Sequence, residues 1–370
     1  MSALTLRHFR NLGTQELSIP EPGVALVGEN AQGKSNLLEA IYYLETLRSF
    51  RGARDDQLVA FGEEVFRVVG VMEDTREGAE VEVAAAFQRR GRRKKATVAG
   101  EEPERLGDAL GHLGAVVFSP ADVGLVNDGP GERRRFLDIV LSLNVEGYLP
   151  ALQRYRHALA QRNAALREHH PRAAVQVWDE PLVRAGACVL AARRCWLGAQ
   201  QDRFSHYHAG VAGGQTALLE YRPGVPLEGV GDGDEMEAAF REALTGSVER
   251  ERRNGATAVG PHRDDLRFRL DGEGGVDVRD YGSGGQRRTV ALALRLMEAA
   301  TIRGLRGREP VILLDDVFAE LDGPRSERVL EIMEREETGQ VILTAPKESD
   351  IRLRGDVLPR WRIRAGRIEA

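Results

Sequence analysis

The sequence predicts an α/β protein with two lobes: a mixed α/β lobe that includes an antiparallel sheet, and a helical second lobe without a long coiled coil. Three observations support this fold class. Short apolar runs such as 311–314 are typical of strands buried in a sheet. Alternating apolar and polar residues, as at 80–83, are typical of antiparallel strands. Leucine and alanine recur at helical spacing over about 122–253, and no heptad pattern is long enough for a coiled coil.

The mixed lobe is expected to begin with two small strands and a glycine-rich loop. Residues 4–9 form a strand whose return partner is 17–19, and 23–28 form a short buried strand. A helical pattern begins just after this strand. Further along the chain, 80–98 is expected to form a hairpin with a basic tip. The mixed lobe should combine residues 1–120 with 260–370, and the helical lobe should comprise 121–259.

Composition and the pattern of apolar residues exclude polycationic, membrane-spanning and secreted proteins. The 370 residues are 42% hydrophobic and 29% charged, with a formal net charge of −5, so the chain is not a polycation. No apolar run approaches the roughly 18 residues of a transmembrane helix. The N-terminus turns polar too early for a signal peptide. We therefore expect a cytoplasmic protein with no membrane partner.

The loop after the buried strand carries the pattern G-x-x-x-x-G-K-S over residues 28–35. Backbone N–H groups in such a loop and at the following helix start form a cradle for phosphates. Lys34 would neutralise the β- and γ-phosphates, and Ser35 would ligate Mg²⁺. The expected nucleotide contacts are Gly28, Glu29, Asn30, Ala31, Gln32, Gly33, Lys34, Ser35 and Asn36, with Ser283, Gly285 and Gln286 from a second motif.

A second buried strand, 311–314, ends in two acids. Asp315 could hold Mg²⁺ directly or through a water, and Asp316 could polarise the attacking water. The alternative is a solvated strand end. Because both strands would serve the same phosphates, 23–28 and 311–314 are expected to be neighbours in one sheet.

The second motif, Gly-Ser-Gly-Gly-Gln at 282–286, is expected to open a helix that continues through Leu305. The free N–H groups of that helix and the Ser283 hydroxyl could bind a γ-phosphate. The alternative is a glycine linker before an ordinary helix.

The order of these motifs, followed by Ala319-Glu320-Leu321-Asp322, resembles that of ABC-type ATPase heads. In that family, two heads sandwich two ATP molecules. The resemblance implies ATP and Mg²⁺ as cofactors, Ser283 acting in trans, Asp316 at the position of the usual glutamate base, and Asp322 at the dimer seam. Asp316 has one methylene less than glutamate, and Ala345 stands where transporters usually carry a histidine. Both departures suggest slow hydrolysis.

Finer motifs resemble the RecF family of bacterial recombination mediators over nearly the whole chain. These motifs are Phe9-Arg10-Asn11, Gly28-Glu29-Asn30, Arg48-Ser49-Phe50-Arg51, Phe118-Ser119-Pro120, Arg133 to Asp138, and Gly260-Pro261-His262-Arg263-Asp264-Asp265. The resemblance implies an ATP-dependent homodimer on duplex or gapped DNA, with slow, DNA-stimulated ATP hydrolysis as a release switch. It also implies recombinational repair, replication restart and the SOS response, in which RecO and RecR help load RecA. A transporter-type ATPase subunit and an SMC-like chromosome-structuring head are the alternatives.

Several basic residues are candidates for contacts with the DNA backbone, where each phosphate contact would make binding salt-dependent. They are Arg48, Arg51, Arg89, Arg90, Arg92, Arg93, Lys94, Lys95, Arg133 and Arg134. The alternative for 89–95 is a solvated charged loop. The alternatives for 133–135 are a dimer contact and pairing with nearby carboxylates. No aromatic residues interleave these patches, so the sequence gives no support for base stacking on single strands.

Overall fold

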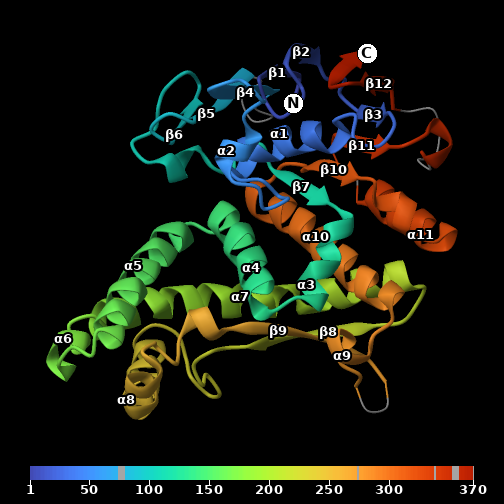
Figure 1. Ribbon diagram of the computed structural model, residues 1–370. Coiled ribbons are helices and arrows are strands. Elements are labelled where there is room, and N and C mark those ends of the chain that lie inside the picture. Colours follow the sequence, from blue (N-terminus) through green and yellow to red (C-terminus); the bar gives the residue numbers. More distant parts are fainter. Residues whose placement is uncertain (74–79, 273–274, 337–338, 352–357, 370) are drawn as a thin grey trace. The chain divides into compact units, whose positions relative to one another are not determined.

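The computed structural model describes residues 1–73, 80–272, 275–336, 339–351 and 358–369 (Figure 1). The chain divides into two compact units. Unit 1 comprises Met1–Val123, Ala209–Gly214 and Ala291–Ala370, and unit 2 comprises Gly124–His208 and Gln215–Val290. The expected boundary at 260 is therefore wrong by about 30 residues, because the strand that follows it pairs within unit 2.

The first sheet of unit 1 is antiparallel and has the strand order β2-β1-β4-β5-β6. Its strands are β1 (Ala3–Arg7), β2 (Thr14–Ser18), β4 (Val65–Glu73), β5 (Glu80–Gln88) and β6 (Arg93–Val98). Leu4 lies opposite Leu17, which confirms the predicted return strand, and β5 and β6 form the predicted hairpin. Alternation along β1 places Leu4 and Leu6 in the core.

The second sheet of unit 1 has the order β13-β12-β3-β11-β10-β7. Its strands are β3 (Gly23–Val27), β7 (Ala115–Phe118), β10 (Val311–Asp315), β11 (Val341–Ala345), β12 (Arg360–Arg364) and β13 (Arg367–Glu369). All are parallel except β13. The prediction that β3 and β10 are neighbours is wrong, because β11 pairs with both. Since the parallel strands end at the same edge, the loops after β3 and β10 still meet there.

Helix α1 (Lys34–Thr46) packs against strands of both sheets, as Figure 1 shows. Its position between two layers explains why it is buried on nearly every face, including the acids Glu39 and Glu45. Arg10 binds both oxygens of Glu39, at 2.9 and 3.0 Å. Glu45 accepts the backbone N–H groups of Leu113 and Gly114, each at 2.8 Å. These partners offset the cost of burying two carboxylates.

The remaining helices of unit 1 lie beside the sheets. They are α2 (Asp55–Leu58), the C-terminal part of α10 (Gly284–Arg306) and α11 (Gly323–Arg335). Short 3-10 turns at Leu106–Ala109, Pro120–Val123, Val317–Glu320 and Glu348–Asp350 connect the elements.

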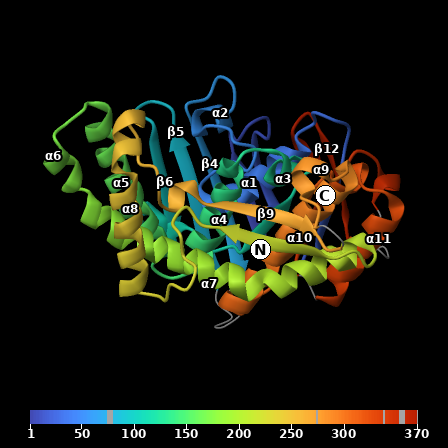
Figure 2. The ribbon, with the colours of Figure 1, turned by 90° about the horizontal axis from the view of Figure 1, so that it is seen from below.

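Unit 2 is mostly helical, as predicted, but it also contains an antiparallel pair of strands, β8 (Ala217–Arg222) and β9 (Asp265–Leu270), which run side by side in Figure 2. Its helices are α3 (Gly124–Asn127), α4 (Pro130–Asn144), α5 (Tyr148–Arg167), α6 (Arg172–Gln176), most of α7 (Asp179–Ala212), α8 (Asp234–Asn254) and α9 (Val278–Tyr281). β8 was not predicted. Among the described residues, no helix combines the length and apolar character needed to cross a membrane.

The segment Gly260 to Asp265 is central to the interior of unit 2. Asp264 is completely buried and accepts bonds from Arg193 (2.6 Å), the Tyr221 hydroxyl (2.6 Å) and the Gly224 N–H (2.7 Å). Burial raises the pKa of Asp264, and the Arg193 guanidinium opposes that rise. This part of the motif therefore ties α7 to β8 and β9.

Candidate nucleotide-binding site

The phosphate loop joins the end of β3 to the start of α1, as the sequence predicted. Gly33 is the residue before α1 and has φ +115°, a conformation that favours glycine. A Cβ on Gly33 would lie 2.7 Å from Asn11 Oδ1, and one on Gly28 would lie 2.6 Å from the Ile363 carbonyl oxygen. A close neighbour therefore requires glycine at 28, and both a close neighbour and the backbone conformation require it at 33.

Residues from two distant segments fix this loop. The Asn11 side-chain amide donates to the Gln32 carbonyl at 3.1 Å, and Asn36 donates to Asn11 Oδ1 at 2.8 Å. The Gly366 N–H also donates to the Gln32 carbonyl, at 2.9 Å. Asn11 thus contacts both Gln32, in the second half of the loop, and Asn36, in the first turn of α1. This role of Asn11 was not predicted from the motif Phe9-Arg10-Asn11, because the contacts join segments that are distant in sequence.

Lys34 lies within the loop rather than in solvent. Its side chain is 4% exposed, and its ammonium donates to the carbonyl oxygens of Gly28 (2.8 Å) and Glu29 (3.2 Å). These bonds place a positive charge beside the free N–H groups at the start of α1, where an anion is favoured.

Ser35 and Asp315 come together at the edge where the parallel strands end. The Ser35 hydroxyl donates to Asp315 Oδ1 at 2.6 Å, although 280 residues separate them in sequence. Asp315 is buried, and that burial raises its pKa, while the bond from Ser35 opposes the rise. The contact joins the phosphate loop to the acidic strand across β11.

Thr344, at the end of β11, occupies the space between the two acids. Its hydroxyl lies 3.3 Å from Asp315 Oδ1 and 3.3 Å from Asp316 Oδ1, and it accepts the Asp316 N–H at 3.0 Å. Asp316 has φ 47°, so its backbone turns sharply just after the strand. Because one hydroxyl has one proton, it can donate to only one carboxylate at a time. Thr344 was not among the predicted site residues. What could have identified it is its position near the end of β11, the strand that pairs with both β3 and β10.

These oxygen atoms fit a magnesium ion. Hydroxyl and carboxylate oxygens are the protein ligands that Mg²⁺ prefers, usually only one or two of them. Ser35 and Asp315 supply one of each, already in contact. A divalent cation would also compensate the buried Asp315 charge, which Ser35 and Thr344 approach only with hydroxyl groups.

The Gly-Ser-Gly-Gly-Gln motif opens α10, as predicted, but it lies in unit 2, whereas the sequence placed it in the mixed lobe. The Gln286 N–H donates to Ser283 Oγ at 3.2 Å, and the Ser283 N–H donates to Gln286 Oε1 at 2.8 Å. This reciprocal pair is a capping box. Ser283 is exposed, as is Tyr281 at 79%, so the start of α10 faces solvent in this chain.

Asp322 caps another helix. Its carboxylate accepts the Arg325 N–H at 2.9 Å at the start of α11 and also pairs with the Arg325 guanidinium. These contacts, led by the backbone bond, lower the pKa of Asp322. Its place at a dimer seam stays a prediction.

The basic hairpin tip is only partly available to a ligand. The Arg89 guanidinium donates to the carbonyl oxygens of Asp56, Val59 and Glu63, so it fastens the hairpin to the preceding loop. Two lysines of the tip also have partners, since Lys94 forms an ion pair with Asp55 at 2.8 Å and Lys95 forms one with Glu102 at 2.6 Å. The arginines that make no such contact with a described residue are Arg90, Arg92 and Arg93.

Arg133 was proposed from sequence as a DNA contact, and the structure contradicts this. It is 2% exposed and binds Asp265 with Nε at 2.6 Å, so it is buried among carboxylate and carbonyl acceptors inside unit 2. Arg134 is half-buried and donates to the Asp264 carbonyl at 2.8 Å. Arg133 therefore does pair with a carboxylate, but with the distant Asp265 and not with a nearby one such as Glu132 or Asp138, as the alternative had it.

Arg48 and Arg51 follow α1 and are both exposed. Arg51 donates to Asn36 Oδ1 at 3.0 Å, which places it next to the first turn of α1. It therefore lies closer to the phosphate loop than the sequence indicated.

Comparisons with known proteins agree with this geometry. Residues 1–358 match the family described as RecF/RecN/SMC N terminal domain. The chain is 41% identical to the DNA replication and repair protein RecF of Synechococcus sp. over 343 residues, which cover 90% of this chain and 89% of that protein. It is 36% identical to RecF of Geobacter sulfurreducens over 370 residues, covering 100% and 99%.

Solved structures agree as well. A structure of the recombination mediator protein RecF with ATP, described as part of the RecFOR pathway, matches with a TM-score of 0.90 and 32% identity over 100% of this chain and 96% of that one. An Smc head with a coiled coil from Pyrococcus yayanosii matches with a TM-score of 0.59 at 15% identity, over 100% of this chain and 96% of that one, which supports the fold alone. The predicted fold class and the predicted family resemblance are both confirmed. The chain belongs to the RecF family of DNA replication and repair proteins, with the ATP-binding head fold of that family.

Proposed function

We propose that this chain is an ATP-dependent DNA-binding protein of recombinational repair and replication restart. ATP and Mg²⁺ would bind at the phosphate loop and promote association of two heads on duplex or gapped DNA. Slow, DNA-stimulated hydrolysis would release the DNA. As the relatives' names and the RecFOR pathway suggest, the protein would act with RecO and RecR in supporting the loading of RecA.

The observation that carries this proposal is the 2.6 Å contact between Ser35 and Asp315. It joins the phosphate loop to the acidic strand end, so that one nucleotide could be held by both. Ser35 and Asp315 would hold Mg²⁺, which when bound would neutralise phosphate charge. Lys34 would bind the β- and γ-phosphates, and Asp316, whose N–H is fixed by Thr344, would orient and polarise the attacking water.

The exposed start of α10 supports a composite site. Ser283 and Gln286 satisfy each other, yet the helix retains N–H groups directed at solvent, a position suited to an anion. In the proposed dimer, Ser283, Gly285 and Gln286 would contact the nucleotide bound by the partner head. Asp322 would lie at the seam.

Light scattering tests the proposal directly. The molar mass would be measured with and without ATP and Mg²⁺, and with a duplex DNA, for wild type, Lys34→Met and Ser283→Arg. We expect wild type to dimerise only with ATP, Lys34→Met to lose nucleotide binding, and Ser283→Arg to bind nucleotide but stay monomeric. A wild-type mass that never changes while nucleotide is bound would contradict the dimer, and DNA binding that is independent of ATP would contradict the switch.

A further inference from the structure

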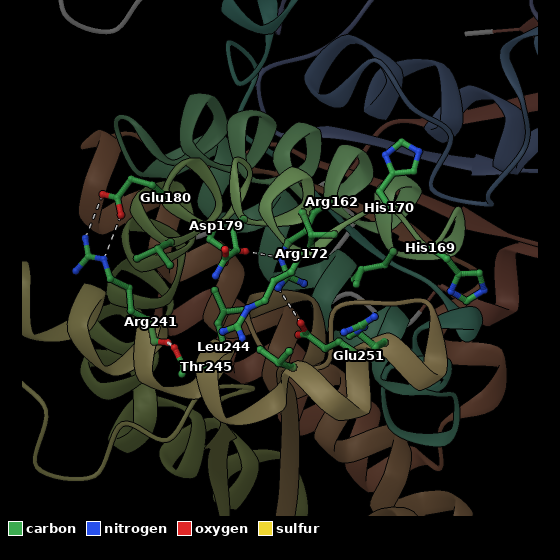
Figure 3. Close-up of a pocket in the computed structure, with 16 residues that line it drawn as sticks. Arg162, His169, His170, Arg172, Asp179, Glu180, Arg241, Leu244, Thr245 and Glu251 are labelled. Carbon is green, nitrogen blue, oxygen red and sulfur yellow. Dashed lines mark hydrogen bonds and ion pairs between the residues drawn. The ribbon is translucent and has the colours of Figure 1, made fainter.

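A pocket of about 370 Å³ lies within unit 2, among α5, α6, the start of α7 and α8 (Figure 3). Its floor is aliphatic, because Leu166, Val183 and Leu244 line it and are all buried. No phenylalanine, tyrosine or tryptophan is among the described residues that line it. The volume lies within the range typical of ligand sites, about 300–1,000 Å³.

The carboxylates around this pocket are already paired. Arg162 binds Asp179 at 2.7 Å and Glu251 at 2.7 Å; all three line the pocket, and Arg162 and Glu251 are nearly inaccessible to solvent. At one end, Arg241 binds both oxygens of Glu180 at 3.1 Å, as Figure 3 shows. These acids therefore offer little free negative charge to a ligand.

Two cations on the pocket wall remain uncompensated. Arg172 on α6 and Arg252 on α8 are exposed, line the pocket, and make no hydrogen bond or ion pair with a described residue. His169 and His170 lie at the end opposite the Arg241–Glu180 pair in Figure 3. His170 is itself paired with Glu168 at 3.0 Å, so the positive charge at the rim comes from Arg172 and Arg252, above an apolar floor, in a chain whose net charge is −5.

We propose that this pocket binds a short acidic peptide segment of a partner protein. An apolar side chain of the segment would lie over Leu166, Val183 and Leu244, and its carboxylates would face Arg172 and Arg252. Charge complementarity favours an acidic occupant, and the enclosed aliphatic floor favours a peptide side chain over a polynucleotide. Single-stranded nucleic acid usually stacks its bases on aromatic rings, and the described residues of this lining include none. The inference is independent of the proposed ATP-driven dimer.

The probe for this proposal is a library of random dodecapeptides displayed on phage. Selection would use the full chain, with counter-selection on a double variant, Arg172→Glu with Arg252→Glu. We expect the surviving sequences to share two or more acidic residues next to a large apolar one. Loss of all sequences on counter-selection, or survivors without acidic residues, would overturn the proposal.

A selected peptide, labelled with fluorescein, would then be titrated by anisotropy against three variants. The double charge reversal should weaken binding by about tenfold or more. Thr245→Trp, which fills the pocket without changing its charge, should also weaken binding. The control Arg253→Glu alters a neighbouring exposed arginine on α8 that does not line the pocket, and should bind as wild type does.

Two further results complete the test. If Arg253→Glu weakens binding as much as the double variant, the effect is general charge, and the pocket proposal fails. If a duplex or single-stranded oligonucleotide displaces the peptide and binds with the same dependence on Arg172 and Arg252, the occupant is nucleic acid and the peptide proposal fails. The change in molar mass on adding ATP and Mg²⁺ should be the same in every pocket variant as in wild type. The peptide proposal and the dimer proposal can therefore fail independently.

Discussion

The phosphate loop of unit 1 and the Gly-Ser-Gly-Gly-Gln turn of unit 2 differ in how the chain uses their polar groups. At the loop, Lys34 and Ser35 come from the start of α1, Asp315 from β10 and Thr344 from β11; three of them are buried and Ser35 is half-buried. At the turn, Ser283 and Gln286 bond each other over three residues and remain at the surface. One site is assembled by tertiary structure, and the other is formed locally and presented to solvent. This difference is what a composite site would need, in which one head holds the nucleotide and another covers it.

Lys34→Met should produce the largest effect and would break the phosphate-loop half of the comparison. The lysine is expected to make charge-assisted bonds to two phosphates, each contributing about 1.5–3 kcal/mol, so ATP affinity should fall by at least about a hundredfold. Titration calorimetry with ATP and Mg²⁺ would measure the loss. Lys347→Met, which changes an exposed lysine after β11, is the matched control. Equal affinities for the two variants would remove Lys34 from the site.

Ser283→Asn sharpens the comparison at the other half. Asparagine caps a helix about as well as serine, so the free energy of unfolding should change by less than about 0.5 kcal/mol. If Ser283 also meets a partner's nucleotide, the bulkier amide should weaken ATP-dependent dimerisation by about tenfold while ATP binding by the monomer is unchanged. Analytical ultracentrifugation across a range of protein concentrations would give the dimer constant.

The companion variant Ser283→Ala separates the two roles. It removes the cap and should cost about 1 kcal/mol of stability. A dimer constant that follows stability through both variants would mean that Ser283 only caps α10. A dimer constant that falls in the stable Asn variant would mean that the residue contacts the partner.

Thr344→Val should have an intermediate effect and tests whether β11 belongs to the site. The change keeps the shape of the side chain but removes the acceptor of the Asp316 N–H and the hydroxyl between the two carboxylates. An unsatisfied backbone group costs about 1–3 kcal/mol, and Asp316 should lose its fixed orientation. We expect single-turnover ATP hydrolysis to slow by about tenfold, with ATP affinity within about threefold of wild type. An unchanged hydrolysis rate would show that Asp316 needs no support from Thr344.

The parts of the fold that depend on local pattern were predictable from sequence. The phosphate loop, both buried strands, the hairpin and the start of α10 follow from spacing and turn residues. The insertion of β11 between β3 and β10 was not, because sheet order is decided by long-range pairing that no local pattern records. Thr344 was missed for the same reason, since it reaches Asp315 and Asp316 only once β11 takes that place.

Charged residues were the least predictable. Arg133 and Arg89 belong to runs of basic residues that look like surface patches, yet one is buried against Asp265 and the other fastens a hairpin. A run of arginines gives the same sequence signal whether its partners are phosphates or distant protein acceptors. The buried bonds of Asp264 to Arg193 and Tyr221 were equally hidden, because the partners come from α7 and β8.

Asp315→Asn should have the smallest effect. The sign of its change in the free energy of unfolding tests whether the buried Asp315 carboxylate destabilises the fold when no nucleotide is bound. Burial raises the pKa of Asp315 in the folded chain. A carboxyl with a raised pKa binds its proton more tightly when folded, so it lowers stability as pH rises above its unfolded value and through its folded value. The penalty is fully present at neutral pH and absent well below the ordinary value of 3.8. Asparagine keeps an acceptor for Ser35 without the charge.

We therefore expect the nucleotide-free Asn variant to be more stable than wild type by about 1 kcal/mol at pH 7.5, with the difference disappearing in acid. Chemical denaturation at a series of pH values would measure it. Adding ATP and Mg²⁺ should reverse the order, because wild type gains the binding free energy of its ligands and the variant gains less. A variant that is less stable at neutral pH without nucleotide would show that Asp315 stabilises the fold. In that case the phosphate loop and the Ser283 turn would differ in burial, but the loop would not reduce the stability of the fold in order to bind its ligands.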